Sequence, residues 1–229
     1  MNKAKLSILK QAVLGLVFFA VVVWLALFIT AGKLTYWQGW LYWIIFFAIV
    51  TAISIYFIRK DPNLISSRVK VGPTAETKRS QKASQALAAI FFVLLLLIPP
   101  IDFRFDWSSV PLYLVLTSDF FVAIGLAVIF FAFRQNTYAS AIIEVKAEQQ
   151  VISTGVYGVV RHPMYSGALL LLFFTSLALG SFWGLLAFFP LLAVICFRLI
   201  DEEKTLSKDL NGYEEYRKRT RYRLIPYVW

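Results

Sequence analysis

The sequence contains little of the chemistry on which many soluble enzymes rely. Its 229 residues include one cysteine and one histidine, and only 16% of them are charged. The single cysteine, Cys196, excludes an intramolecular disulfide, and with the single histidine, His162, it excludes a zinc cage of Cys and His ligands. A charged fraction this far below the usual ~25% also argues against a soluble domain. Any chemistry must therefore come from Arg, Glu, Asp and Tyr side chains or from a bound cofactor.

Apolar residues are correspondingly abundant, at 59% of the chain with a mean hydropathy of +0.70. Such a composition would leave large apolar patches on a soluble protein, whereas lipid makes that surface favourable. Four apolar runs have the length of about 20 residues that a bilayer core requires. These predicted spans are residues 12–31, 39–58, 83–100 and 111–133.

A longer apolar run, residues 168–200, exceeds the length of one straight span. Gly180 and Ser181 near its middle predict a turn, which would divide it into a hairpin of helices at 164–179 and 182–200. The predicted fold is therefore an all-α polytopic transmembrane bundle of about six spans that includes a carboxy-terminal helical hairpin. We expect two parts, the amino-terminal helices of residues 1–133 and a functional core of residues 134–229.

The net charge of +10 is distributed unevenly among the predicted connections. In a six-span arrangement, 21 of the 23 basic residues lie on one side of the membrane, and only Lys33 and Arg104 lie on the other. Basic connections stay in the cytoplasm, so both termini are predicted to be cytoplasmic. We expect a multi-pass protein of a prokaryotic plasma membrane, or of the endoplasmic reticulum in a eukaryote. The charge is then a topology signal that attracts anionic lipid, and we expect no nucleic-acid partner.

Polar residues gather in two predicted cytoplasmic regions, and the first is residues 134–167. It contains a strand-like stretch at 141–145, a turn signal at Thr154-Gly155 and a proline, Pro163, suited to the first turn of a helix. Such a helix end offers unpaired N–H groups to an anion such as a carboxylate, and Arg161 and His162 directly precede it. The alternative is that Arg161 and His162 are ordinary residues at the membrane interface and bind no ligand.

The second region is residues 198–229, which begins where the last apolar helix is expected to continue into the cytoplasm. Arg198 and Glu202 are then four residues apart on one helix face, which fits a simple salt bridge. Three consecutive acids, Asp201 to Glu203, repel one another, so a cationic ligand is the second hypothesis. The tail at 213–229 alternates aromatic with basic residues, and we interpret it as an interfacial lid.

Two features inside the spans lie outside these regions. Asp119 is near the middle depth of the fourth span, where an unpaired charge costs several kcal/mol. We expect it to form a hydrogen bond between packed helices. The aromatic cluster at residues 36–43 is typical of an interfacial aromatic belt.

The two polar regions, in this order around a helical hairpin, resemble the isoprenylcysteine carboxyl methyltransferase family. That family belongs to a broader group of integral-membrane methyltransferases that includes phospholipid methyltransferases. The resemblance extends over roughly residues 134–229. Its matching pieces are Gly155-Val156-Tyr157, the string Arg161-His162-Pro163-Met164-Tyr165-Ser166-Gly167, Arg198 with Glu202-Glu203 and Leu206, Gly212-Tyr213 with Tyr216, and Leu224-Ile225-Pro226.

The resemblance implies a methyltransferase core at 134–229 that binds S-adenosylmethionine beside a tunnel open to lipid. It implies that Arg198 orients a lipophilic or prenylated substrate and that Glu202 acts in catalysis and in cofactor binding. The family often has His where this chain has Gln149, so backbone contacts are the ones expected there. The implied cofactor-binding positions are Gln149, Gln150, Val151, Ile152, Tyr157, His162, Pro163, Met164, Tyr165 and Glu202.

Three other functions remain open at the level of sequence. Membrane sterol reductases, which use NADPH, share the string from Arg161 to Gly167, although the double Glu argues against them. A phospholipid N-methyltransferase would need a base to remove a proton from its amine, and no residue is an obvious base. A small transporter or a non-catalytic scaffold is disfavoured because Asp119 is nearly alone as an ionisable residue within the spans.

Overall fold

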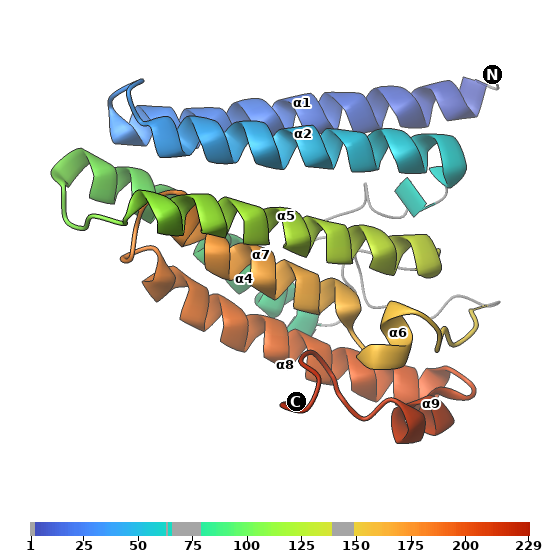
Figure 1. Cartoon of the computed structure of the whole chain (residues 1–229). Helices are drawn as coiled ribbons and strands as arrows, with labels where there is room; N and C mark the ends of the chain where they lie inside the picture. Colours follow the sequence, from blue (N-terminus) through green and yellow to red (C-terminus); the bar gives the residue numbers. More distant parts are fainter. Residues whose placement is uncertain (1–2, 63, 66–78, 139–148) are drawn as a thin grey trace.

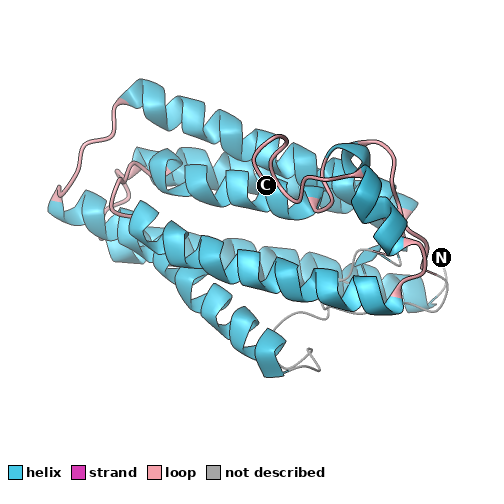
Figure 2. Cartoon of the chain, turned by 90° about the horizontal axis from the view of Figure 1, so that it is seen from below, coloured by secondary structure: helices cyan, strands magenta, loops and turns pink. Residues whose placement is uncertain are grey.

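The computed structural model describes residues 3–62, 64–65, 79–138 and 149–229, and this part of the chain contains helices and no strand. Six long helices form the body of the molecule (Figure 1). They are α1 (Lys3–Ala31), α2 (Trp37–Lys60), α4 (Arg79–Phe105), α5 (Leu112–Gln135), α7 (Pro163–Ala178) and α8 (Leu185–Asp209). Two short helices, α6 (Val156–Val159) and α9 (Tyr213–Arg219), lie at one end. The predicted all-α class is confirmed, while the strand-like stretch at 141–145 falls outside the described residues (Figure 2).

Four of these helices are long and apolar enough to cross a bilayer. Three of them contain a predicted span entirely, and α5 contains the fourth except for Pro111, which precedes the helix. One difference concerns α4, which we expected to end at Pro100 but which continues to Phe105. Pro99 and Pro100 are buried inside the helix. Prolines are tolerated in such helices because neighbouring helices can satisfy the backbone groups that they leave unpaired.

The predicted hairpin is present as α7 and α8. Helix α7 ends at Ala178, and Gly180 has a φ of 76°, a left-handed conformation that favours glycine. Helix α8 begins at Leu185, later than expected, because the hydroxyl of Ser181 accepts the N–H of Gly184 at 3.1 Å and extends the turn. It then continues to Asp209, as the absence of a break signal predicts.

The connections of the bundle divide between its two ends. Figure 1 shows the α1–α2, α4–α5 and α7–α8 connections at one end, and the amino terminus, α6 and α9 at the other. Lys33 and Arg104, the two basic residues predicted to be apart from the rest, belong to the first end. In the described structure these two residues are therefore separated from basic residues at the other end, such as Arg161 after α6 and Arg219 at the end of α9.

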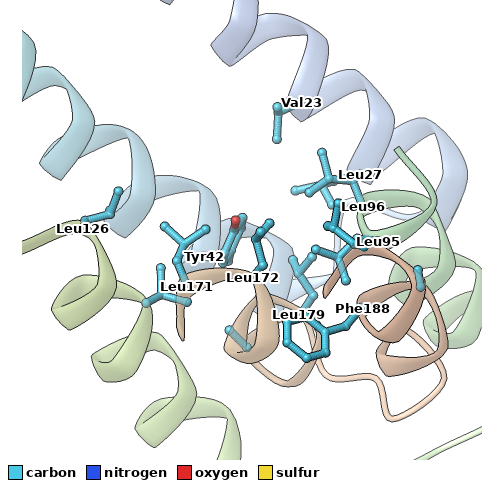
Figure 3. Close-up of a cluster of buried hydrophobic side chains, with 14 of the residues drawn as sticks. Val23, Leu27, Tyr42, Leu95, Leu96, Leu126, Leu171, Leu172, Leu179 and Phe188 are labelled. Atoms are coloured by element: carbon cyan, nitrogen blue, oxygen red, sulfur yellow. The ribbon is translucent and has the colours of Figure 1, made fainter. Parts of the chain in front are cut away.

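The backbones of α5 and α7 approach each other closely at two glycines. A Cβ added to Gly167 would lie 2.7 Å from the carbonyl oxygen of Gly125, and one added to Gly125 would lie 2.7 Å from that of Gly167. Small residues allow such contact between membrane helices. Apolar side chains from the neighbouring helices fill the core around this contact (Figure 3), and those labelled there are Val23, Leu27, Tyr42, Leu95, Leu96, Leu126, Leu171, Leu172, Leu179 and Phe188.

Several polar residues inside the bundle differ from expectation. The two carboxylate oxygens of Asp119 have no hydrogen-bond partner among the described residues, so the expected helix-packing hydrogen bond is absent there. Tyr36 and Tyr42 are buried in the bundle, not placed in a lipid-facing belt. The reason is that their hydroxyls have partners on the hairpin, namely the carbonyl oxygen of Leu179 at 2.6 Å and the hydroxyl of Thr175 at 3.2 Å.

Asp102 links several elements at the end of the bundle that contains the α4–α5 and α7–α8 connections. Its fully buried carboxylate accepts the backbone N–H of Ser108 at 2.7 Å, together with the hydroxyls of Ser108 and Ser181. These bonds join α4, the α4–α5 connection and the hairpin turn. The turn between α7 and α8 is thereby fixed at the end of the bundle that is far from α6 and α9. The candidate site lies at the α6 and α9 end.

Candidate functional site at the α6 and α9 end of the hairpin

The three consecutive acids of α8 have three different protein partners. Successive helical residues point about 100° apart, so neighbours in sequence do not share a face. Asp201 accepts a hydrogen bond from the side-chain Nε2 of Gln81 on α4. Glu202 accepts one from the hydroxyl of Tyr165 on α7 at 2.7 Å. Glu203 turns toward the carboxy-terminal segment. These separate partners explain how the chain accommodates adjacent acids without a shared cationic ligand.

Glu203 is the centre of a buried cluster of charges. Its Oε1 accepts a hydrogen bond from Nε of Arg161 at 2.6 Å and lies 3.2 Å from Nε2 of His162. Its Oε2 accepts one from Nε of Arg223 at 2.8 Å. Arg161 is buried, so the carboxylate compensates a positive charge that is removed from water.

The surroundings of Glu203 keep its carboxyl group ionised. Burial by itself raises the pKa of this group. Hydrogen bonds from His162, Arg161 and Arg223 outweigh burial, and the net effect is a pKa well below the ordinary value of 4.5. The Glu203 carboxylate therefore stays negatively charged, with several hydrogen-bond donors around it.

The same cluster ties the carboxy-terminal segment to the start of α7. The backbone N–H groups of Arg161 and His162 donate to the carbonyl oxygens of Tyr222 at 2.9 Å and Arg223 at 3.0 Å. The hydroxyl of Ser166 donates to the carbonyl of Leu224 at 2.6 Å. The segment predicted as a lid thus lies directly over the first turn of α7, which begins at Pro163 as expected.

A second polar group, next to the first, consists of Tyr165, Glu202 and Arg198. Besides its bond to Glu202, the Tyr165 phenol interacts with the Arg198 guanidinium. Arg198 also donates from Nη1 to Oε1 of Gln81 at 2.9 Å. Arg198 and Glu202 are therefore brought together on one face of α8, as their spacing predicts, with a tyrosine of α7 beside both.

The remaining predicted cofactor positions lie around α9 and α6. Val151 packs against an apolar cluster of Leu210, Tyr213 and Tyr216, while its neighbours Gln149 and Ile152 are half-buried and Gln150 is exposed. Tyr157 is buried in α6, and its carbonyl oxygen accepts the hydroxyl of Tyr216 at 2.8 Å. Met164 is half-buried against the core of the bundle.

One buried polar group in this region has no hydrogen-bond partner within the described part of the chain. It is the hydroxyl of Tyr213, whose residue is only 4% exposed. Burial raises the pKa of this phenol, and the carboxylates of Glu203 and Glu202 raise it further. The hydroxyl therefore stays protonated and remains available as a donor.

Sequence reasoning did not identify the roles of Glu203, Arg223 and Gln81. The string of three acids and the adjacent Arg161 and His162 were the signals in the sequence that could have indicated Glu203. Nothing in the spacing indicates Gln81, which contacts Arg198 from a distance of 117 residues along the chain.

Comparison with known proteins relates part of the chain to a family of membrane enzymes. Residues 113–211 match the phospholipid methyltransferase family. The match begins in α5, ends after α8 and contains every predicted site residue, although it covers less than half of the chain. It supports the broader group of membrane methyltransferases that the sequence resembles, without specifying the isoprenylcysteine enzymes.

A second comparison finds a different activity. The chain is 39% identical over 88 residues to Delta(14)-sterol reductase TM7SF2 of Mus musculus. This alignment covers 35% of the present chain and 20% of the reductase, so the chain spans about a fifth of the length of this curated relative.

Proposed function

We propose that the protein is an integral-membrane methyltransferase that transfers a methyl group from S-adenosylmethionine to a lipophilic carboxylate, such as that of a prenylated cysteine. The observation that carries this proposal is the polar group of Tyr165, Arg198 and Glu202 at the end of the hairpin. It offers one cation for an acceptor carboxylate and one anion for a cationic cofactor. The match of residues 113–211 to the phospholipid methyltransferase family supports the reaction class.

The residues present fit the proposed cofactor. S-adenosylmethionine carries a sulfonium that supplies the methyl group, an ammonium, a carboxylate and ribose hydroxyls. The buried, unpartnered hydroxyl of Tyr213 is suited to a polar ligand beside the predicted segment 149–152. Glu202 is half-buried with Oε2 already oriented by Tyr165, and it would accept from an ammonium or a hydroxyl. The first turn of α7 at Pro163 would receive the carboxylate.

The chain would contribute positioning more than acid or base catalysis. A carboxylate acceptor is already ionised at neutral pH, so no residue has to remove a proton from it. Arg198 would orient the carboxylate, and the carboxy-terminal segment over α7 would exclude water. His162 has its Nε2 directed at Glu203, a contact that favours a positioning role over that of a base.

The direct test is to incubate the purified protein with S-adenosylmethionine labelled in its methyl group and a total lipid extract. Transfer to a carboxylate gives a methyl ester, which mild alkali hydrolyses to volatile labelled methanol. Transfer to a phospholipid amine, the alternative that the family match favours, gives an alkali-stable product. Label that resists alkali would exclude carboxylate methylation, and absence of any transfer would contradict the methyltransferase proposal.

Two variants separate the proposed roles. Glu202→Ala should weaken S-adenosylmethionine binding about 10–100-fold, since a hydrogen bond to a charged group contributes about 1.5–3 kcal/mol. Arg198→Ala should reduce turnover while leaving cofactor affinity nearly unchanged. Glu215→Ala, at an exposed position on α9, is the matched control. Unchanged cofactor affinity in the Glu202 variant, measured by calorimetry, would remove that assignment.

A second candidate, an NADPH-dependent sterol or lipid double-bond reductase, is favoured by the similarity to the mouse sterol reductase. The two proposals differ in the cofactor that stabilises the native protein. A ligand that binds the folded state raises Tm by mass action, so a thermal-shift comparison of NADPH with S-adenosylmethionine discriminates between them. A shift with NADPH alone would favour the reductase.

A further inference from the structure

Gln81, in the first turn of α4, lies outside the region that matches the methyltransferase family, yet its side chain reaches the candidate site. The residue is fully buried, with 0% of its surface exposed. Its Oε1 accepts the Nη1 hydrogen of Arg198 at 2.9 Å, and its Nε2 donates to Oδ2 of Asp201. The hydroxyl of Ser80 donates to the same carboxylate oxygen at 3.4 Å.

This arrangement uses both halves of the amide. A primary amide has a donor and an acceptor group, and each must be paired when the side chain is buried. Arg198 and Asp201 are three residues apart on α8 and so lie on one face. The amide of Gln81 contacts both of them and turns its oxygen toward the cation and its nitrogen toward the anion. Its orientation is therefore fixed from two sides.

The consequence concerns the guanidinium of Arg198. An arginine side chain has several rotatable bonds, and ordering it costs conformational entropy. Gln81 on α4 and Tyr165 on α7 hold the group between two helices. Because Gln81 is neutral, it orients the guanidinium without neutralising its charge.

We propose that Gln81 is a positioning residue that holds Arg198 in place for the acceptor carboxylate, by means of the amide contact between α4 and α8. This inference rests on the proposed function and extends the site to a helix outside the family match. It makes the amino-terminal half of the chain part of acceptor recognition, while the cofactor is held by α7, α8 and the residues around α9.

The test uses the full-length protein, labelled S-adenosylmethionine and an N-acylated S-prenylcysteine as acceptor. Gln81→Leu removes both amide contacts, and kcat/KM for the acceptor should fall about 10–100-fold, mainly through KM, because the guanidinium is displaced. The affinity for S-adenosylmethionine, measured by calorimetry, should change less than twofold. Gln11→Leu, an exposed position on α1, is the matched control and should leave both quantities unchanged.

The isosteric variant Gln81→Glu separates positioning from packing. Its second carboxylate oxygen would lose the bond to Asp201 and repel that carboxylate, so retained affinity for S-adenosylmethionine is the check that the variant is folded. Its carboxylate would pair with Arg198 and compete with the acceptor, so the acceptor KM should rise at least as much as in Gln81→Leu. The inhibition constant of the matching neutral acceptor amide should not change in either variant. A purely structural role would alter the amide and the carboxylate equally.

The outcomes distinguish this inference from the function on which it rests. If the wild-type protein transfers methyl groups and the variants lose acceptor affinity selectively, the positioning role is supported. If the wild type transfers methyl groups but Gln81→Leu and Gln81→Glu leave the acceptor KM unchanged, or weaken cofactor binding to the same extent, this inference is overturned alone. If the wild type methylates no acceptor, both are overturned.

Discussion

Among single residues, Glu203 combines burial with the largest set of charged partners in the described structure. It joins Arg161 and His162 at the start of α7 to Arg223 in the carboxy-terminal segment. Removing one member of such a cluster leaves the others buried with uncompensated charge. The stability of the bundle end that holds α6 and α9 should therefore depend on this carboxylate more than on either acid that precedes it.

Glu203→Gln keeps the shape of the side chain but removes its charge. We expect the free energy of unfolding to fall by about 3 kcal/mol, the lower end of the cost of breaking a buried ion pair. For a chain of this size that corresponds to a decrease in Tm of roughly 6–12 °C, measurable by thermal unfolding in detergent. Glu215→Gln, at an exposed position, serves as the control and should change Tm little.

The contribution of Glu203 should also depend on pH. Its pKa in the folded protein lies below the ordinary value of 4.5, so folding favours the ionised form. The resulting stability is fully present above about pH 4.5 and is lost as the pH falls further, through the folded-state pKa. The Tm difference between wild type and Glu203→Gln should therefore narrow in acid. A constant difference down to pH 3.5 would contradict an electrostatic role.

The partners of the acids show the limit of prediction at this scale. The short spacing between Arg198 and Glu202 lies within one helix, so their common face was predictable. Glu203 bonds residues that are 42 and 20 positions away along the chain, and only tertiary packing brings those residues together. The same holds for Asp119, whose expected hydrogen bond depended on what neighbouring helices present to it.

At the scale of helices, the sequence predicts which helices exist and in what order they follow better than it predicts the residues at which they begin and end. Span length and the Gly180 turn are local signals, and both led to helices that the structure contains. The continuation of α4 beyond Pro100 was not predictable, because the burial that makes those prolines tolerable comes from other helices. Similarly, the sequence shows that residue 167 is a glycine, but it does not show that this glycine packs against the backbone of α5.

The contact between Gly125 and Gly167 leads to a prediction for the α5–α7 pair. Gly167→Leu would place side-chain atoms where the backbone of α5 lies, and overpacking of this kind costs about 1–3 kcal/mol or more. We expect a decrease in Tm of at least roughly 3–5 °C, together with loss of any activity that requires the hairpin geometry. Thermal unfolding in detergent measures the change.

Gly15→Leu is the matched control for this experiment. A Cβ at Gly15 of α1 would meet no atom within 4 Å, so the same substitution is free of steric conflict there. It should leave Tm unchanged or raise it, since Leu favours helix over Gly. Equal losses of stability at Gly15 and Gly167 would show that glycine substitution as such, and not the α5–α7 contact, causes the effect.

For the whole molecule, the two ends of the bundle have different chemistry. One end is closed by the neutral and acidic group around Asp102. Arg104 follows Asp102 closely in sequence, and Lys33 lies in the α1–α2 connection at the same end. The other end holds the clusters of Arg161, Glu203 and Arg198 and is where most of the basic residues were predicted to gather. Helix α4 connects these ends, since it carries Asp102 near one terminus and Gln81 near the other.

This asymmetry predicts the orientation of the protein in a bacterial membrane. Basic connections remain on the cytoplasmic side, so the end with α6 and α9 should face the cytoplasm. In a Cys196→Ser background, Lys33→Cys in the exposed α1–α2 connection should react with a membrane-impermeant maleimide applied to intact cells. Asn211→Cys, exposed between α8 and α9, should react only after the membrane is permeabilised. The reverse pattern would place the candidate site outside the cell, where cytosolic S-adenosylmethionine could not reach it, and would contradict the orientation and the proposed function together.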